Sequence, residues 1–321
     1  MHNESIVFIG EAMLELVNVD QKTLAKSFAG DVYNTSVYLK RAFPSLNASF
    51  LSAIGSDEIS TEFMQLAKNE AIDMSLTAQS NTLHMGIYMV VNDEHGERSF
   101  IYWRNQSAAR NMISSLSESQ KSAAKQFKHL FLSGITLAIL QPEERDAFWT
   151  FLRDIKAGGT KIIFDPNYRE RLWASKEDAQ QQMQQAFELS DWLMPGLEDF
   201  NDLYGLDTIE ACIEFCASYN FEELVLKQGA ESVHVVNSDG HHIIPIIASQ
   251  NVVDTTSAGD AFNGVYIGAR LHENSVTMAV KLANAAACEV IATPGAIMPK
   301  ERFEACWAAL HSLSKNTSNI L

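Results

Sequence analysis

The chain has 321 residues, of which 46% are hydrophobic and 20% charged, and this composition is typical of a globular protein. Its formal net charge is −16 at pH 7. Such an excess of acidic groups argues against nucleic-acid binding, which requires clustered Lys and Arg. No apolar stretch reaches the roughly 18 residues that a membrane-spanning helix needs, and the apolar run 6–9 is too short for a signal peptide. We therefore expect a cytoplasmic protein with no membrane contact.

Apolar periodicity predicts mixed elements in the first third of the chain. Strands are expected at 5–9, 13–19, 23–28 and 48–54, and helices at 31–43, where Pro44 stops the helix, and at 58–69. Two more strands, 84–91 and 97–103, flank the turn-rich segment Asn92-Asp93-Glu94-His95-Gly96, which indicates a hairpin.

A regular alternation of strands and helices begins near residue 128. The predicted strands are 129–133, 161–164, 191–194 and 223–227, and the predicted helices between them are 143–157, 177–189 and 208–219. A second hairpin turns at Asn237-Ser238-Asp239-Gly240, and helices follow at 258–271, 276–291 and 300–313. The alternation predicts right-handed βαβ units, hence an α/β fold whose mostly parallel sheet has helices on both faces.

Two N-terminal hairpin regions do not fit that alternation. We expect segments of about 12–29 and 84–106 to leave the main sheet and form a small β lid, inserted in one α/β domain that covers 1–321. Lids exclude water from sites that transfer phosphoryl groups. Apolar residues on both faces of the lid strands indicate that the lid also joins subunits of a homo-oligomer.

The cysteines show no metal-binding spacing. Cys212 and Cys216 are four residues apart on a predicted helix, without the Cys-x-x-Cys pattern or a nearby His pair. We expect these two residues, and Cys288 and Cys306, to be reduced and buried.

Residues 254–264, Asp-Thr-Thr-Ser-Ala-Gly-Asp-Ala-Phe-Asn-Gly, carry the strongest chemical signal. Small residues lead directly into a helix, whose first N–H groups are unpaired and lie at the positive end of the helix dipole. An anion can approach such a start closely, and Asp260 is placed to accept a proton from a hydroxyl that attacks the anion. The pattern indicates phosphoryl transfer to an alcohol. Alternatively, Asp254 and Thr255 are ordinary caps and Asp260 an ordinary first-turn acid.

A second glycine element, Ala29-Gly30-Asp31-Val32-Tyr33-Asn34, precedes the predicted helix 31–43. Alone it is more typical of a helix cap than of a ligand site. Together with residues 254–264 it brackets the α/β core, and at this point the chain resembles the PfkB (ribokinase-like) sugar kinases over essentially its whole length. Segments 30–34 and 254–264 match the two signatures of that family.

The resemblance implies that Asp260 is the catalytic base. It implies an anion hole for the migrating phosphoryl group, formed by the N–H groups of Ser257, Ala258, Gly259 and Asp260. ATP with Mg²⁺ is the implied phosphoryl donor, and a requirement for a monovalent cation stays open. The nucleotide is expected near Lys227 and Gly229, with Asn284 in the adenine pocket and Gly295 near the ribose; Asn284 is equally typical of a solvent-facing helix position.

Within the family, the likeness is to kinases of the sugar acid 2-keto-3-deoxygluconate. It rests on residues 10–16 (GEAMLEL), 102–109 (YWRNQSAA), 132–135 (LSGI) and 165–173 (DPNYRERLW). An acidic chain needs fixed cations to hold a carboxylate, and the planar fork of arginine suits one. Arg104 and Arg169 are the candidates. The alternative for any arginine is a surface ion pair, and this suits Arg171 better than Arg169.

The resemblance also assigns the remaining substrate contacts. The phenols of Tyr88 and Tyr102 donate hydrogen bonds, Glu15 binds sugar hydroxyls and Gly30 offers its backbone. Asp31 and Asn34 flank the same pocket. A tyrosine on a lid strand is also commonly a packing residue.

The chain departs from the family pattern at two places. Many PfkB kinases carry Asn-x-x-Glu after the strand that here ends near Met194, whereas this chain has Gly196-Leu197-Glu198-Asp199. No metal ligand is therefore assigned. Ser257 stands where glycine is common, and it can supply its N–H provided that the position needs no positive φ.

The predicted function is ATP-dependent phosphorylation of the 6-hydroxyl of 2-keto-3-deoxygluconate. A kinase of a neutral sugar such as fructose is one alternative, although the arginines would then have no carboxylate to bind. A non-catalytic sugar-acid sensor that kept the fold is another, against which an intact Asp260 argues.

Overall fold

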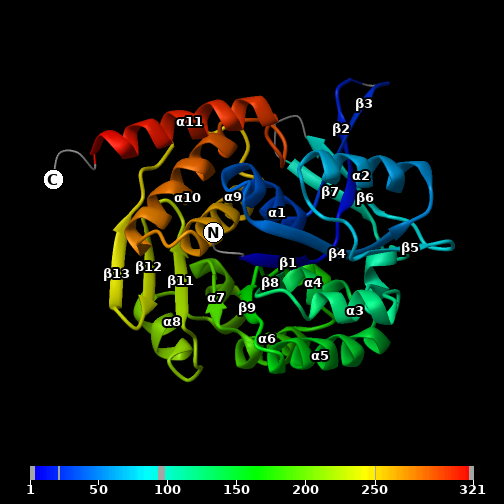
Figure 1. Ribbon diagram of the computed structural model, residues 1–321, viewed down its shortest axis with the longest axis horizontal. Helices are drawn as coiled ribbons and strands as arrows, with labels where there is room; N and C mark the ends of the chain where they lie inside the picture. Colours follow the sequence, from blue (N-terminus) through cyan, green and yellow to red (C-terminus); the bar gives the residue numbers. More distant parts are fainter. Residues whose placement is uncertain (1–3, 21, 93–97, 250, 318–321) are drawn as a thin grey trace.

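The computed structural model describes residues 4–20, 22–92, 98–249 and 251–317. Figure 1 shows one broad sheet with helices on both sides and a smaller sheet that projects from one end. The broad sheet has nine strands in the order β13-β12-β11-β10-β9-β8-β1-β4-β5. From β5 to β11 neighbouring strands are parallel, whereas β12 and β13 are antiparallel. The predicted α/β class with a mostly parallel sheet is confirmed.

The strands of the broad sheet lie close to their predicted positions. They are β1 (Ser5–Ile9), β4 (Asn47–Gly55), β5 (Thr77–Ser80), β8 (His129–Ser133), β9 (Lys161–Asp165), β10 (Trp192–Leu193), β11 (Glu223–Gln228), β12 (Ser232–Asn237) and β13 (Gly240–Pro245). The predicted strand 191–194 is longer than β10, and β5 had no counterpart in the sequence analysis.

Alternation along β1 divides the core into two layers. Ile6 and Phe8 point to one face, where Phe8 meets Phe131 of β8 at 5.7 Å between ring centroids. Val7 and Ile9 point to the other face. The first face is covered by α1 (Asp31–Ala42), α2 (Glu58–Asn69), α9 (Ala258–Leu271), α10 (Val276–Ile291) and α11 (Lys300–Thr317). The second is covered by α3 (Glu118–Ala124), α4 (Gly134–Ile139), α5 (Pro142–Ala157), α6 (Lys176–Leu189), α7 (Leu197–Tyr204) and α8 (Ile209–Cys216).

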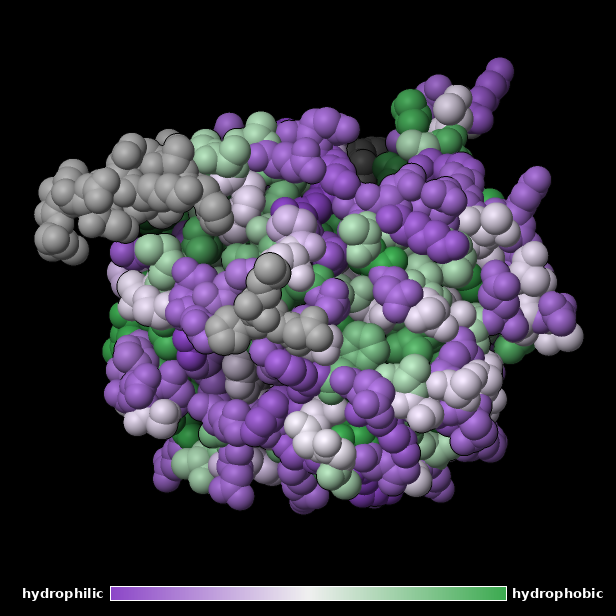
Figure 2. Space-filling view, viewed as in Figure 1, coloured by the Kyte–Doolittle hydropathy of each residue, from purple (hydrophilic) through white to green (hydrophobic). Residues whose placement is uncertain are grey.

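The projecting sheet contains the N-terminal strands that were predicted to leave the main sheet. Its order is β3 (Leu24–Ala29), β2 (Met13–Asn18), β6 (Gly86–Asn92) and β7 (Arg98–Trp103). Its inner face packs on α2, where Phe28 and Phe63 lie 5.6 Å apart between ring centroids. Figure 2 shows hydrophobic atoms gathered near the tip of the projection. The predicted turn at 92–96 lies largely outside the described residues.

Two further expectations can be compared with the structure. Within the described ranges, no helix is both long and apolar enough to cross a membrane. All four cysteines are free thiols, but only Cys212 and Cys216 are buried, whereas Cys288 and Cys306 are half-buried. The last two lie on α10 and α11, which form the outer layer of the molecule (Figure 1).

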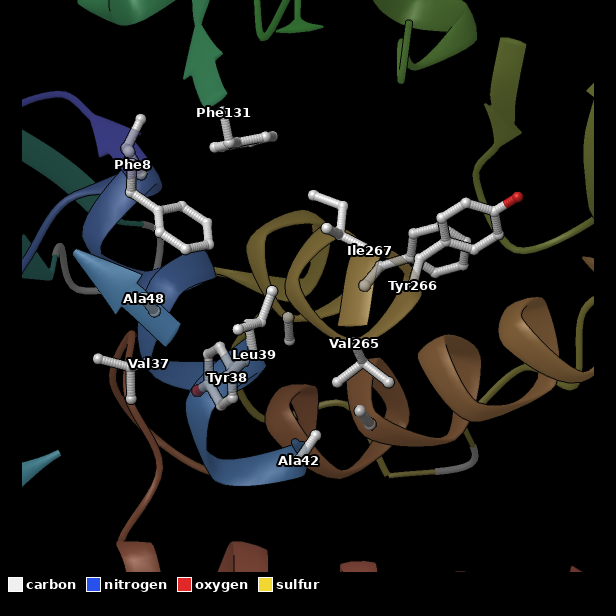
Figure 3. Packing of buried hydrophobic residues seen from close by; sticks show 14 of the residues in the cluster. Phe8, Val37, Tyr38, Leu39, Ala42, Ala48, Phe131, Val265, Tyr266 and Ile267 are labelled. Carbon is white, nitrogen blue, oxygen red and sulfur yellow. The ribbon is translucent and has the colours of Figure 1, made fainter. Parts of the chain in front are cut away.

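Helices α1 and α9 pack unusually closely. Figure 3 shows side chains from both helices, with those of β1 and β8, pointing into one cluster. A Cβ on Gly264 would lie 2.3 Å from the carbonyl oxygen of Thr35 and 3.0 Å from the amide nitrogen of Leu39. Only a residue without a side chain allows this separation, because backbone atoms of α1 cannot move aside as a flexible side chain can.

Replacing Gly264 by alanine should therefore lower the free energy of unfolding by about 1–3 kcal/mol, the usual cost of overpacking. The matched variant Gly259→Ala, in the same helix, meets no atom within 4 Å and should leave stability unchanged or slightly higher. Urea unfolding followed by circular dichroism measures both. Equal stability of the two variants would contradict this account of the helix crossing.

Candidate active site

The start of α9 presents free backbone donors. Within the described part of the chain, the N–H groups of Gly259 and Asp260 donate to no carbonyl outside the helix, and that of Ala258 makes one long bond of 3.4 Å to Thr255. The added Cβ at Gly259 meets open space. Asp254 supports this turn, since its carboxylate accepts from the N–H of Thr256 at 3.0 Å and of Gly295 at 2.7 Å. These amides can therefore receive an anion.

Ser257 adopts a left-handed backbone, with φ 66° and ψ 9°. The condition set for this residue, that no positive φ be needed, is therefore not met. A non-glycine residue in this region stores about 1 kcal/mol of strain, and such strain is concentrated at functional sites. This left-handed conformation is one that favours glycine.

Asp260 lies between α9 and α1. Its Oδ2 accepts a hydrogen bond of 2.9 Å from Nδ2 of Asn34, so the two glycine elements of the sequence meet in space. The Oδ1 of Asn34 in turn accepts from the N–H of Gly30 at 3.3 Å. Burial, followed by the negative charge of Asp31, raises the pKa of Asp260 to about 7, although the bond from Asn34 lowers it. A carboxylate with a pKa near neutrality is suited to accept a proton.

Further carboxylates surround Asp260. Burial raises the pKa of Asp31, which accepts from Nδ2 of Asn167 at 3.0 Å. Asp165, at the end of β9, accepts from Nδ2 of Asn263 at 2.8 Å. Asn263 is fully buried in α9 and was not singled out from the sequence, although it lies within the 254–264 signature.

Lys227 is the cation beside this acidic cluster. Its Nζ donates to Oδ1 of Asn263 at 3.1 Å and lies 3.6 Å from Oδ1 of Asp165. The side chain expected near the nucleotide is thus held at the edge between β11 and α9. Gly229, just beyond it, has φ 52°, and Gly295 has φ 88°. Both therefore occupy backbone conformations that favour glycine.

Asp199 is the acid that stands where many relatives are expected to carry the Glu of Asn-x-x-Glu, but backbone N–H groups occupy both of its carboxylate oxygens. Its two oxygens accept from the N–H groups of Tyr168 at 2.7 Å and Gly196 at 2.8 Å. Burial, and then the charge of Asp165, raises its pKa to about 7. The described residues offer no group of three or more His, Cys, Asp or Glu side chains that could hold a metal ion. The side chains of this part of the chain therefore do not fit a resident metal.

The projecting sheet contributes a second group of polar residues. Glu15 of β2 is buried and accepts hydrogen bonds from the hydroxyls of Ser27, at 2.7 Å, and Tyr88. Tyr102 of β7 stands beside Tyr88, with 5.8 Å between ring centroids, and remains 47% exposed. Burial raises the pKa of Tyr102, whereas the charges of Arg104, Arg169 and Arg171 lower it. Three arginines therefore lie within electrostatic reach of one phenol.

These arginines differ in their surroundings. Arg104 is buried, its guanidinium pairs with the carboxylate of Glu11, and its carbon Cζ lies 5.7 Å from the centre of the Tyr102 ring. Arg169 and Arg171 are exposed, and the described residues show no acid paired with either. Glu11 was not identified from the sequence, where it appears only as part of the segment 10–16.

Asn284 on α10 is half-buried, and its Nδ2 donates to the carbonyl of Ile247 at 3.2 Å. It is therefore not a freely solvated helix residue. Its place in an adenine pocket stays a prediction.

Comparison with known proteins indicates the family of the chain. Residues 3–302 match the family model described as "pfkB family carbohydrate kinase". The 2-dehydro-3-deoxygluconokinase of Escherichia coli K12 is 38% identical over 94% of this chain and 100% of its own length. The enzyme of the same name from Dickeya dadantii is 35% identical over 95% and 100%. The crystal structure of 2-dehydro-3-deoxygluconokinase from Thermotoga maritima superposes with a TM-score of 0.78 at 22% identity, covering 96% of this chain and 99% of that one.

The chain belongs to the pfkB family of carbohydrate kinases. The similarity to the Thermotoga maritima structure, at 22% identity, shows the shared fold alone.

Because its pKa is raised in the folded protein, Asp260 lowers the free energy of unfolding, and the size of this effect depends on pH. Below the ordinary value of 3.8 the carboxyl is protonated in both folded and unfolded chains, and it costs nothing. Between 3.8 and about 7 the folded state binds more protons, so the free energy of unfolding falls as pH rises, and above about 7 the full cost is present.

Asp260→Asn should accordingly stabilise the protein by about 1–3 kcal/mol at pH 8, and the gain should shrink as pH falls toward 5. Thermal unfolding from pH 5 to pH 8 measures it, with the exposed Asp146→Asn of α5 as a control that should show little change. A gain that grows toward acid pH would mean that the pKa of Asp260 is lowered, not raised.

Proposed function

We propose that this chain is an ATP-dependent kinase that phosphorylates the 6-hydroxyl of 2-keto-3-deoxygluconate, giving ADP and 2-keto-3-deoxy-6-phosphogluconate. The carrying observation is the position of Asp260, held by Asn34 beside the free amides at the start of α9. The relatives named 2-dehydro-3-deoxygluconokinase support the choice of sugar acid.

In the proposed mechanism, Asp260 accepts the proton of the 6-hydroxyl while that oxygen attacks the γ-phosphorus of ATP. The bond between the γ-phosphorus and the bridging oxygen breaks, and the electron pair leaves with ADP. The N–H groups of Ser257, Ala258, Gly259 and Asp260 hold the γ-phosphoryl oxygens, and the dipole of α9 favours the negative charge there. The proton on Asp260 then passes to solvent.

The sugar acid is expected between the start of α1 and the projecting sheet, which acts as a lid. Arg169, exposed and without a described acidic partner, offers a fork to the carboxylate, and Arg104 adds the donors that Glu11 leaves free. The remaining substrate residues are expected to bind the sugar hydroxyls and the keto group. They are Glu15, Gly30, Asp31, Asn34, Tyr88 and Tyr102.

The nucleotide is proposed to lie beyond the start of α9, along Lys227, Gly229, Asn284 and Gly295. Mg²⁺ enters as part of MgATP, because the side chains within the described ranges form no metal site of their own. Activity assays with and without potassium decide whether a monovalent cation is needed.

A coupled assay of ADP release tests the function directly. With MgATP, 2-keto-3-deoxygluconate should be turned over with a far higher kcat/KM than fructose or ribose, because only the acid pairs with the arginines. Preference for fructose would favour a neutral-sugar kinase, and binding of the acid without ADP release would favour a sensor.

Asp260→Asn should lower kcat by about 10²- to 10⁴-fold while sugar-acid binding is retained, because a positioned base contributes that much. In the unsubstituted enzyme, kcat/KM should rise with pH and level off above a pKa of about 7, that of Asp260 in the free enzyme. Undiminished turnover in the variant would refute its role as base.

We also propose that the lid joins two copies of this chain. Strand β7 is an edge of its sheet, and on its outer side Ile101 and Trp103 are 43% and 54% exposed. Large apolar residues on an open strand edge are costly unless another surface covers them.

Light scattering after gel filtration should therefore show a homo-oligomer at micromolar concentration, and Trp103→Glu should shift it to the monomer. Val253→Asp is the matched control, because Val253 is 56% exposed but lies outside the lid. A monomeric parent protein would end the proposal.

A further inference from the structure

Glu11 lies where the lid joins the body of the protein. It belongs to the connection between β1 and β2, and its partner Arg104 directly follows β7. Gly30, after β3, approaches so closely that a Cβ there would lie 2.2 Å from the carbonyl oxygen of Glu11. A Cβ on Gly86, which opens β6, would lie 2.8 Å from Oε1 of Glu11. All four lid strands therefore enter or leave the body around this one ion pair.

The pair is incompletely satisfied. Glu11 is 4% exposed and Arg104 is 6% exposed, yet Oε1 of Glu11 and Nε of Arg104 have no hydrogen-bond partner within the described residues. Buried polar atoms without a partner are rare, and each one calls for an explanation. A ligand that binds Arg104 is one such explanation, but it does not account for the free oxygen of Glu11.

Arg110 is a further cation within electrostatic reach of Glu11. It sits on the short helical turn Ala108–Asn111, just after Arg104, and is half-buried. Its Nε is buried without a partner, and the structure shows no acid paired with it among the described residues. Burial lowers its pKa, and among its neighbours the negative charge of Glu11 opposes that shift most strongly. Arg145, whose charge also acts on Arg110, is already paired with an acid: its Nη1 lies 2.7 Å from Oδ1 of Asp178.

The neutral Glu11–Arg104 pair has no net positive charge with which to attract a substrate carboxylate. Arg104 and Glu11 together are neutral, so an acid that binds Arg104 adds a second carboxylate to this buried pair. Such an arrangement is unfavourable unless another cation balances it. Arg169, the other candidate for the acid, is exposed, so water and salt screen its charge. Arg110 is a half-buried cation within electrostatic reach of Glu11, and the described residues show no acid paired with it.

We propose that Glu11 and Arg110 are positioning residues for acid recognition: Glu11 fixes Arg104 at the root of the lid, and Arg110 offsets the charge of Glu11, so that Arg104 remains available to a substrate carboxylate. Neither residue touches the sugar. The inference rests on the proposed function, because it assumes that the substrate is a sugar acid bound at Arg104.

A double-mutant cycle that removes the two charges tests the proposal. Arg110→Met removes the balancing charge and should raise KM for 2-keto-3-deoxygluconate, and its Kd by calorimetry without ATP, about tenfold, with kcat changed less than about twofold. Arg110→Lys should restore most of the affinity. Adding Glu11→Gln to Arg110→Met should also restore it, because the amide still accepts from Arg104 but brings no charge to be balanced.

Arg153→Met, at an exposed arginine of α5, is the control and should change neither constant. The proposal is overturned if Arg110→Met leaves KM and Kd unchanged, or if the double variant binds the acid no better than Arg110→Met alone. Melting curves identify variants that fail to fold. If Arg110→Met fails to fold, the single variants Arg110→Lys and Glu11→Gln are compared with the parent protein instead. If the parent enzyme binds the acid but releases no ADP, the proposed function fails, and the calorimetric ratios still decide the present inference.

Discussion

The contact between the first turns of α1 and α9 is the constraint on which the site depends. Gly264 lets the two helices approach until backbone meets backbone, and one turn earlier Asn34 holds Asp260. Because both helices begin at this point, the positive ends of two helix dipoles converge there. An acidic protein thereby creates a local region suited to an anion without adding basic side chains.

The same region is costly to fold. Asp31, Asp199 and Asp260 all have raised pKa values, chiefly because burial disfavours their charged forms. Ser257 adds backbone strain at the start of α9. Hydrogen bonds from Asn34 to Asp260 and from Asn167 to Asp31 offset part of this cost with neutral donors. Amides rather than cations suit this task, because a cation beside Asp260 would lower its pKa and weaken it as a base.

Most of the fold could be predicted from the sequence because its information is local. Periodicity placed α2, α9 and α10 at their observed ends, and the alternation after residue 128 indicated the parallel sheet. Short elements such as β5, α4 and α7 were missed, since a few residues carry no resolvable period. The predicted helix 208–219 is also shorter than expected, because α8 ends at Cys216.

The sequence indicated the candidate site where one segment carries the chemistry, and it missed contacts between residues that are distant in the chain. The signature 254–264 contains both Asp260 and its amides, so it could be read directly. Glu11 and Arg104 are 93 positions apart, and no pattern in either segment predicts that they form an ion pair. The strain at Ser257 was equally hidden, because a sequence shows which residue occupies a turn but not the backbone angle that the turn imposes.

Under the proposed function, the location of Arg104 would connect recognition of the sugar acid with movement of the lid. Arg169 and Arg171 are exposed and can reach a ligand without disturbing the body of the protein. Arg104 instead stands among the four lid connections, packed against Glu11 and close to the backbone of Gly86. A carboxylate that draws on Arg104 must therefore alter the electrostatic balance of the junction itself. A neutral sugar in the same pocket would leave that junction unchanged, so the charge of the substrate, and not only its shape, would influence how firmly the lid closes before Asp260 acts.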